Sequence, residues 1–279
     1  MENTIYNKFS EKYDQLFLDQ LINFAENAKN EKEKEYVNYY PSFGVLPNEQ
    51  CDFIIYGQAV NGWGDSFNIN ETSESLKVRM SKSIEFSNSY YSPNNHCPLD
   101  WVNVYWSAKS YASFVTTSDE IEFYKPISYH TCKSFFWNVT YKFISQYYNL
   151  DINGWEWAKK IIWSNLYKIA PPKGNPSYYT KKYQEQFAIE LVKQEIEEIK
   201  PKYCLVLTND AWWEPFRRGL RTKSVPQDKG PEIISFEEYN ETKIIVTSRP
   251  FRGNSSNHVS KILDLISNHE RNQSSKSII

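Results

Sequence analysis

The order of apolar segments predicts an α/β fold in which a parallel sheet carries helices on both faces. Three observations support this. Amphipathic helical patterns alternate along the chain with short apolar runs. The runs are continuous rather than alternating, as in strands that are buried on both faces. The chain has 279 residues, of which 40% are hydrophobic and 16% aromatic, and this suffices for the core of one domain.

The first half of the chain contains one clear helix, one strand and a segment without a regular pattern. Residues 9–28 are predicted to form a helix because apolar side chains recur at helical spacing, namely Tyr13, Leu16, Phe17, Leu21 and Phe24. Residues 53–56 are apolar and end at Gly57, which is typical of a buried strand. Residues 63–117, rich in Asn, Ser and Tyr, are predicted to be a long loop, either functional or an insertion.

The second half of the chain alternates helices with strands. Helices are predicted at residues 128–148, 181–200, 210–216 and 257–269, and strands at 161–169, 203–207, 233–236 and 244–247. These elements are assigned to a single domain, residues 1–279, whose core spans 52–269. The C-terminal tail, residues 270–279, is predicted to be frayed.

Charge and composition exclude several classes of protein. The formal net charge of −2 excludes a nucleic-acid binder that acts through its overall charge, so any phosphate contact needs a local basic patch. No run of about 18 apolar residues is present, and no membrane partner is predicted. The first residues, MENTIYNKF, contain no apolar segment of a secretory signal.

The four cysteines lack C-x-x-C spacing, so neither a metal site nor a cofactor is predicted. Cys51 and Cys204 border or enter apolar runs, which favours buried free thiols over the alternative of two disulfides. Free thiols indicate a reducing compartment, and the predicted location is cytoplasmic.

The residues that follow each predicted strand form the candidate site, because ligands of parallel sheets bind outside the carboxyl ends of the strands. These segments are 57–65, 165–176, 208–210 and 248–254. The first, GQAVNGWGD, holds three glycines that permit close approach of a ligand, and Trp63 is a candidate for stacking on it. It has neither the glycine spacing of a dinucleotide site nor the lysine of a P-loop. A structural turn is the alternative interpretation.

Polar residues in two other segments suit a flat or anionic ligand. The amide of Asn165 offers one acceptor and two donors, as the edge of a nucleobase requires, although it could instead satisfy nearby backbone groups. Arg249 and Arg252 precede the last helix, whose N-terminus favours an anion. Salt bridges are the alternative role for these two arginines.

Taken together, the strand-end motifs resemble those of the uracil-DNA glycosylase superfamily. The similar segments are FIIYGQAVNGWG, IIWSNLYKIAPP, EIEEIKPKYCLVLTNDAW and KIIVTSRPFRGNSSNH, and they lie within residues 52–266. The resemblance implies a three-layer αβα sandwich with a short, mainly parallel central sheet. It also implies an enzyme that flips a uracil-type or modified base out of DNA and hydrolyses its N-glycosidic bond, with DNA as partner.

The resemblance also implies roles for individual residues. Gln58 falls in the first motif, Asn165 where the family often places the amide that reads the base, and Arg249 in the last motif. Trp63 or Phe67 would stack on the flipped base. The predicted base-binding set is therefore Gln58, Trp63, Phe67 and Asn165.

The first and last motifs depart from the family at the positions that carry the chemistry. Gln58 and Ala59 stand where the family has an acidic residue or Asn, and Arg249 replaces a His. Glycosidic hydrolysis passes through a cationic state that gains from a nearby carboxylate. Asp65 or Asn61 would have to substitute for it, and Arg249 would stabilise the departing base. These three residues are the candidate catalytic groups.

Several functions remain open at this stage. The leading hypothesis is a DNA glycosylase-like enzyme, and the alternative is a non-catalytic module that binds a nucleobase, nucleotide, DNA or partner protein. A hydrolase of an unrelated small substrate is disfavoured, because no G-x-S-x-G motif is present. The predicted phosphate contacts are Arg217, Arg218, Arg221 and Arg252, for which a solvated surface cluster is the alternative.

Overall fold

Two β-sheets and the helices around them make up the computed structural model, which describes residues 5–45, 50–60, 62–88, 97–99, 101–104, 131–151, 156–249 and 255–276. The larger sheet has the order β2-β5-β3-β7-β10-β9-β8. Its strands are β2 (Ser42–Phe43), β3 (Phe53–Ala59), β5 (Ile161–Tyr167), β7 (Tyr203–Val206), β8 (Lys223–Ser224), β9 (Ile233–Tyr239) and β10 (Thr242–Thr247). The smaller sheet has the order β4-β1-β6, with β1 (Glu35–Asn38), β4 (Ser66–Asn68) and β6 (Ile169–Ala170).

The four central strands of the larger sheet are parallel. β3 pairs with β5 on one side and with β7 on the other, and β7 pairs with β10. All residues of β5 and β7 are buried, which explains why both form continuous apolar runs in the sequence. β2, β9 and β8 add antiparallel pairs at the margins, so the sheet is mixed with a parallel centre.

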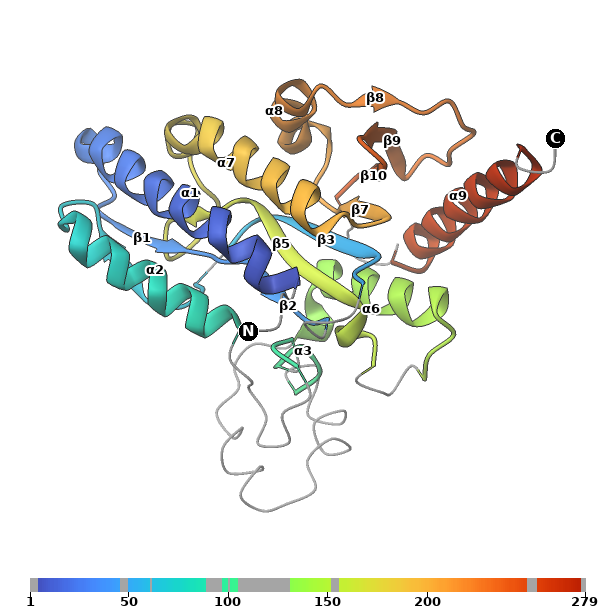
Figure 1. Ribbon diagram of the computed structural model, residues 1–279, viewed down its shortest axis with the longest axis horizontal. Coiled ribbons are helices and arrows are strands. Elements are labelled where there is room, and N and C mark those ends of the chain that lie inside the picture. The colour runs from blue at the N-terminus through green and yellow to red at the C-terminus, as the bar shows by residue number, and fades with distance from the viewer. Residues whose placement is uncertain are drawn as a thin grey trace, which may run out of the picture.

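Helices cover both faces of this sheet, as Figure 1 shows. The helices are α1 (Ile5–Asn27), α2 (Ser73–Asn88), α3 (Trp101–Val104), α6 (Phe135–Tyr147), α7 (Tyr178–Ile199), α8 (Asp210–Leu220) and α9 (Ser255–Lys276). α1, α7 and α8 share one core cluster with the sheet, and α6 and α9 share another. The predicted α/β architecture with helices on both faces is therefore confirmed.

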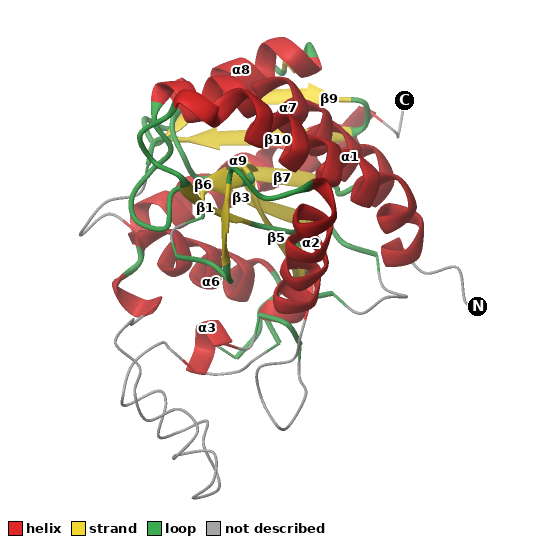
Figure 2. Cartoon of the chain, turned by 90° about the vertical axis from the view of Figure 1, so that its left-hand side faces the viewer, coloured by secondary structure: helices red, strands yellow, loops and turns green. Residues whose placement is uncertain are grey.

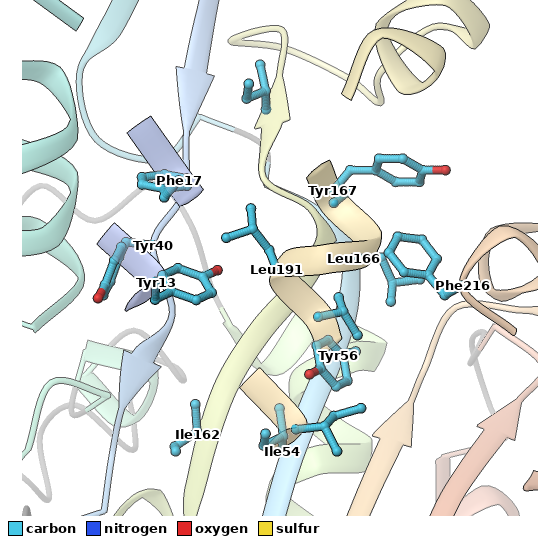
Figure 3. Packing of buried hydrophobic residues seen from close by; sticks show 14 of the residues in the cluster. Tyr13, Phe17, Tyr40, Ile54, Tyr56, Ile162, Leu166, Tyr167, Leu191 and Phe216 are labelled. Atoms are coloured by element: carbon cyan, nitrogen blue, oxygen red, sulfur yellow. The ribbon is translucent and has the colours of Figure 1, made fainter. Parts of the chain in front are cut away.

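Side-chain alternation along the strands separates the two cores. Ile54 and Tyr56 of β3 pack toward α1 and α7, where Tyr13 and Leu191 lie close to them in Figure 3. Phe53 and the other residues of opposite orientation pack toward α6 and α9. Most of the described aromatic rings lie in these two cores, as the helix periodicities predicted.

Two predictions about chain segments are wrong in the described residues. Residues 73–88, within the segment predicted to be a long loop, form α2, whose buried stripe includes Leu76 and Met80. The tail prediction fails because α9 continues to Lys276. Glu270 anchors this end of the helix, because its carboxylate accepts a hydrogen bond of 2.6 Å from Lys202 Nζ. Residues 105–117 of the predicted loop lie outside the described part.

The cysteines and helices bear on two further expectations. All four cysteines are free, and Cys51 and Cys204 are buried as predicted. Among the described residues, no helix combines the length and apolarity needed to cross a membrane.

An ion pair lies within the core, below the end of β5. Lys168 and Glu195 are both fully buried, and Lys168 Nζ lies 2.6 Å from Glu195 Oε1. The ammonium also donates to Ser164 Oγ at 2.6 Å and to the carbonyl oxygen of Asn165 at 2.5 Å. Tyr13 of α1 donates to Glu195 Oε1 at 2.7 Å. Burial lowers the pKa of the Lys168 ammonium, and the Glu195 carboxylate opposes that shift.

Removing one partner of this pair should destabilise the fold strongly. Lys168→Met leaves the Glu195 carboxylate buried without its cation, which costs about 3–5 kcal/mol of unfolding free energy. Lys12→Met is the matched control. Lys12 is exposed and forms an ion pair of 2.7 Å with Glu198, so its loss should change the unfolding free energy little. Urea denaturation measures both, and equal stabilities of the two variants would contradict the prediction.

Candidate functional site

The loops that follow the parallel strands meet at one edge of the larger sheet, here named the carboxyl edge. Figure 2 shows these loops gathered on the side toward which the arrow of β10 points. The register places Gly57 of β3 beside Asn165 of β5. Gln58 Nε2 donates to the carbonyl oxygen of Thr208, after β7, at 3.4 Å. Gln58 and Asn165, two residues that the sequence predicts for one site, therefore lie at the same edge, but strand alternation directs Gln58 to the face of α1 and α7 and Asn165 to the face of α6.

Asn165 lies 2% exposed at the centre of this edge. Its Nδ2 is buried and has no hydrogen-bond partner among the described residues. A Cβ atom built on Gly57 would lie only 2.4 Å from Asn165 Oδ1, so the amide occupies the space that any larger residue would need. A buried donor without a partner is costly, and it marks the position where a ligand acceptor would be favourable.

Aromatic rings surround this amide. The same Cβ position on Gly57 lies 3.5 Å from Cε2 of Phe136, a half-buried ring of α6. Trp163 lies two residues before Asn165 in β5, so both side chains face α6. The Nε1 of Trp163 is also buried and has no partner in the described part. The region therefore combines packed aromatic rings with two buried donors that lack partners in the described part, Asn165 Nδ2 and Trp163 Nε1.

Trp63 belongs to the wall of this region rather than to an open stacking face. Its ring lies 4.9 Å from Trp163 and 4.9 Å from Phe86, both edge to face, and 5.4 Å from Trp101. Its Nε1 donates to Ser87 Oγ at 3.2 Å. The side chain is half-buried, so it joins the loop after β3 to α2 and supports Trp163.

The backbone is strained where β7 leaves the sheet. Asn209 has φ of 128° and ψ of 174°, a region that is essentially restricted to glycine. Its side chain accepts a hydrogen bond from Trp212 N at 3.3 Å and caps α8. The cap directly precedes the first residue of the predicted helix 210–216. Strain of this kind is often retained at functional sites, and here it adjoins the Gln58–Thr208 contact.

A buried histidine stands at the end of β10. His258, in the first turn of α9, is fully buried, and its Nε2 lies 3.1 Å from the carbonyl oxygen of Ser248 and 3.3 Å from Ser248 Oγ. Because a carbonyl oxygen only accepts, Nε2 carries the proton, and Nδ1 of the neutral ring is an acceptor. Nδ1 is buried and has no partner in the described stretches.

The structure describes two of the three predicted catalytic residues. Asp65 is an exposed carboxylate that lies 3.3 Å from Lys82 Nζ of α2, and no contact joins it to Asn165 within the described residues. Arg249 is exposed immediately after Ser248. The predicted residues Asn61 and Arg252 lie outside the described part of the chain.

The prediction that Phe67 stacks on a base is wrong. Its side chain is 0% exposed, in β4 of the smaller sheet. The ring packs 6.5 Å from Phe24 and 6.2 Å from Tyr36, so it belongs to the core beneath α1. The sequence could not show this, because β4 is too short to reveal which side chains alternate inward.

Two arginines of the predicted basic turn pair with carboxylates of the fold. Arg217 lies 2.7 Å from Asp210 and 2.8 Å from Glu237, so its guanidinium is neutralised within the fold. Arg218 pairs with Glu214 at 2.8 Å. Arg221 directly follows α8. The next strand, β8, pairs with residues 237–238 of β9, and these pair in turn with residues 243–244 at the start of β10. The turn therefore lies at the edge of the sheet opposite the carboxyl edge.

Sequence reasoning missed several residues of the site. Phe136 lies on a helix with many aromatic residues, and nothing in that pattern distinguishes a ring that lines a site from one that packs in the core. His258 is surrounded in the sequence by apolar helix positions. Asn209 carried a detectable signal, because Asn commonly caps helices and tolerates positive φ.

Neither metal ions nor relatives add to this picture. In the stretches that the structure describes, no cluster of three or more His, Cys, Asp or Glu side chains is arranged to hold a metal ion. The sequence matches no protein-family model, and no curated protein matches it.

A methyl group at Gly57 should disturb the site through Asn165. Gly57→Ala places Cβ 2.4 Å from Asn165 Oδ1, and we expect a loss of about 1–3 kcal/mol in unfolding free energy from overpacking. The same substitution in an Asn165→Ala background should cost less, because the opposing amide is gone. Denaturation of the four proteins of this cycle measures the coupling, and strictly additive costs would contradict it.

The Arg217 network should make the fold sensitive to acid. Burial alone would raise the pKa of Glu237, but hydrogen bonds from Ser235, Thr222, Trp213 and Arg217 outweigh it and hold that pKa below the ordinary value of 4.5. The stabilisation is complete above the ordinary value and is lost as pH falls through the lowered one. Glu237→Gln should therefore lose less stability than the wild type between about pH 5 and pH 3. Exposed Glu11→Gln is the control, and parallel pH profiles would refute the assignment.

Proposed function

We propose that this protein is DNA glycosylase-like and binds a uracil-type or modified base, flipped out of DNA, at the carboxyl edge of its parallel sheet. The observation that carries the proposal is the buried amide of Asn165, whose Nδ2 is unpaired beside the bare backbone of Gly57. The parallel centre of the sheet and the strand-end motifs support it.

The chemistry of the edge suits a 4-oxopyrimidine. Such a base presents a carbonyl acceptor next to a ring N–H donor, and one carboxamide can satisfy both. Asn165 offers a free Nδ2 donor and an Oδ1 acceptor on one planar group. Phe136 supplies an aromatic ring beside this amide, because its Cε2 lies 3.5 Å from the Cβ position on Gly57 that Asn165 Oδ1 occupies.

Hydrolysis of the glycosidic bond is the second candidate, and a specific observation favours it. The described part of the carboxyl edge contains no carboxylate in contact with Asn165, and the proton acceptor that it offers is the unpaired Nδ1 of His258, at the end of β10 and separated from β5 by β3 and β7. Without such a proton acceptor the site would bind a base and leave its bond intact. Base binding is therefore the proposal, and hydrolysis is a separate outcome of the same experiment.

Base binding should depend on the Asn165 amide. Isothermal titration of the protein with uracil, and with a DNA strand that carries one uracil, should show binding that weakens about tenfold or more in Asn165→Ala. Asn23→Ala is the matched control, because Asn23 is a half-buried amide of α1 that donates to the carbonyl oxygen of Tyr183 at 3.1 Å, and it should bind normally.

Two readouts decide between the candidates. Failure of the wild-type protein to bind free bases and lesion-bearing strands, or equal binding by Asn165→Ala, would reject the proposal. Release of free base, followed by chromatography beside an active glycosylase, would add hydrolysis to it if His258→Gln abolishes the release while binding persists. Binding without release would assign the protein to the non-catalytic alternative.

A further inference from the structure

Two neighbouring tyrosines on α7 are the most exposed aromatic side chains of the described chain. Tyr178 is 69% exposed and Tyr179 is 55% exposed, in a protein whose other described rings are largely buried. Their rings lie 5.4 Å apart edge to face, and Tyr179 stacks on Tyr183 at 6.4 Å. These three residues form a tyrosine ridge along the first turns of the helix. Contiguous exposed aromatics of this kind mark interaction surfaces.

The ridge carries positive charge. Lys182 is exposed on the same turns of α7, Lys173 is exposed in the segment before the helix, and Lys181 lies with Nζ 4.6 Å from the ring centre of Trp212 on α8. The first turn of α7 contains no acidic residue, although the dipole of a 22-residue helix favours one there. Lysines near a helix N-terminus are unfavourable unless an anion occupies the surface. The local charge therefore points to a negatively charged partner.

The ridge adjoins the carboxyl edge. Residues 171–177 join β6 to α7, and the carbonyl oxygen of Pro172 lies 3.6 Å from a Cβ built on Gly62, in the loop that follows β3. On the other side, Tyr167 at the end of β5 contacts Trp212 with ring centres 5.8 Å apart. The surface is thus connected to the segments on both sides of the site and faces solvent beside it.

We propose that the tyrosine ridge, with Lys173, Lys181 and Lys182, binds the single-stranded DNA next to the base held at the carboxyl edge. Phenol rings stack on any base, and lysines contact the phosphates between them. The ridge replaces the basic turn as the DNA contact of the protein. Its placement relative to the base rests on the proposed function, whereas its affinity for an undamaged strand does not.

Exposed rings without a surrounding apolar groove suit stacked bases better than a protein segment. A helix or strand from a partner protein would need a continuous apolar surface to bury. The ridge instead alternates phenol rings with lysines, and the carboxylate of Glu31 near the Tyr183 hydroxyl limits the positive surface at that end. Charge and spacing therefore favour a nucleic-acid strand.

Fluorescence anisotropy with a labelled ten-nucleotide strand of undamaged DNA tests the ridge. Tyr178→Ala/Tyr179→Ala should bind it about 5- to 150-fold more weakly for each base that no longer stacks on a ring, whereas Tyr178→Phe/Tyr179→Phe should bind like the wild type. Lys77→Ala/Val78→Ala, a pair of exposed residues on α2, is the control and should change nothing. Lys173→Ala/Lys182→Ala should reduce the salt dependence by about 1.4 in slope.

The outcomes separate the ridge from the base site. Free-uracil binding should be unchanged in the tyrosine variants, since they leave Asn165 intact. Weakened strand binding with no binding of any base by the wild type would support the ridge and reject the proposed function. Wild-type affinity of the alanine pair for DNA, or no DNA binding by the wild type, would overturn the ridge even if a protein later proved to bind there.

Discussion

One buried ammonium group fixes the geometry on which the carboxyl edge depends. Lys168 Nζ contacts the hydroxyl of Ser164, the main-chain carbonyl of Asn165 and the carboxylate of Glu195. The end of β5 is thereby attached to α7, and through Tyr13 to α1. The main-chain carbonyl of Asn165 is thereby held in place, and with it the end of β5 that carries the candidate amide.

This constraint explains why a costly pair is retained in the core. A buried ion pair contributes little net stability compared with apolar residues of the same size, but it permits one arrangement of its partners. Here the partners come from a strand and two helices whose ends carry the candidate site and the tyrosine ridge. The protein thus holds unpaired polar atoms of Asn165 and His258 at fixed positions, which is the condition for selective binding.

The sequence predicted the strands and helices that have a clear hydrophobic pattern, and it predicted one part of the site. Continuous apolar runs located β3, β5, β7 and β10, and the strand-end rule placed Gln58 and Asn165 at the same edge of the sheet. It missed β1, β2 and β4, which have four residues or fewer and so carry no usable periodicity. It misplaced Arg217 because spacing along the chain does not tell which edge of a sheet a turn reaches. The Lys168–Glu195 pair joins distant segments and has no local signal.

The tryptophans beside the site give the protein an optical property of its own. Trp163 contacts Trp63 and Trp137, each at 4.9 Å between ring centres, and lies 5.8 Å from Trp101. Indoles this close exchange excitation energy, so their ultraviolet emission and circular dichroism arise from the group rather than from separate rings. Because Trp163 shares a strand with Asn165, the native spectrum of the protein reports directly on the end of β5.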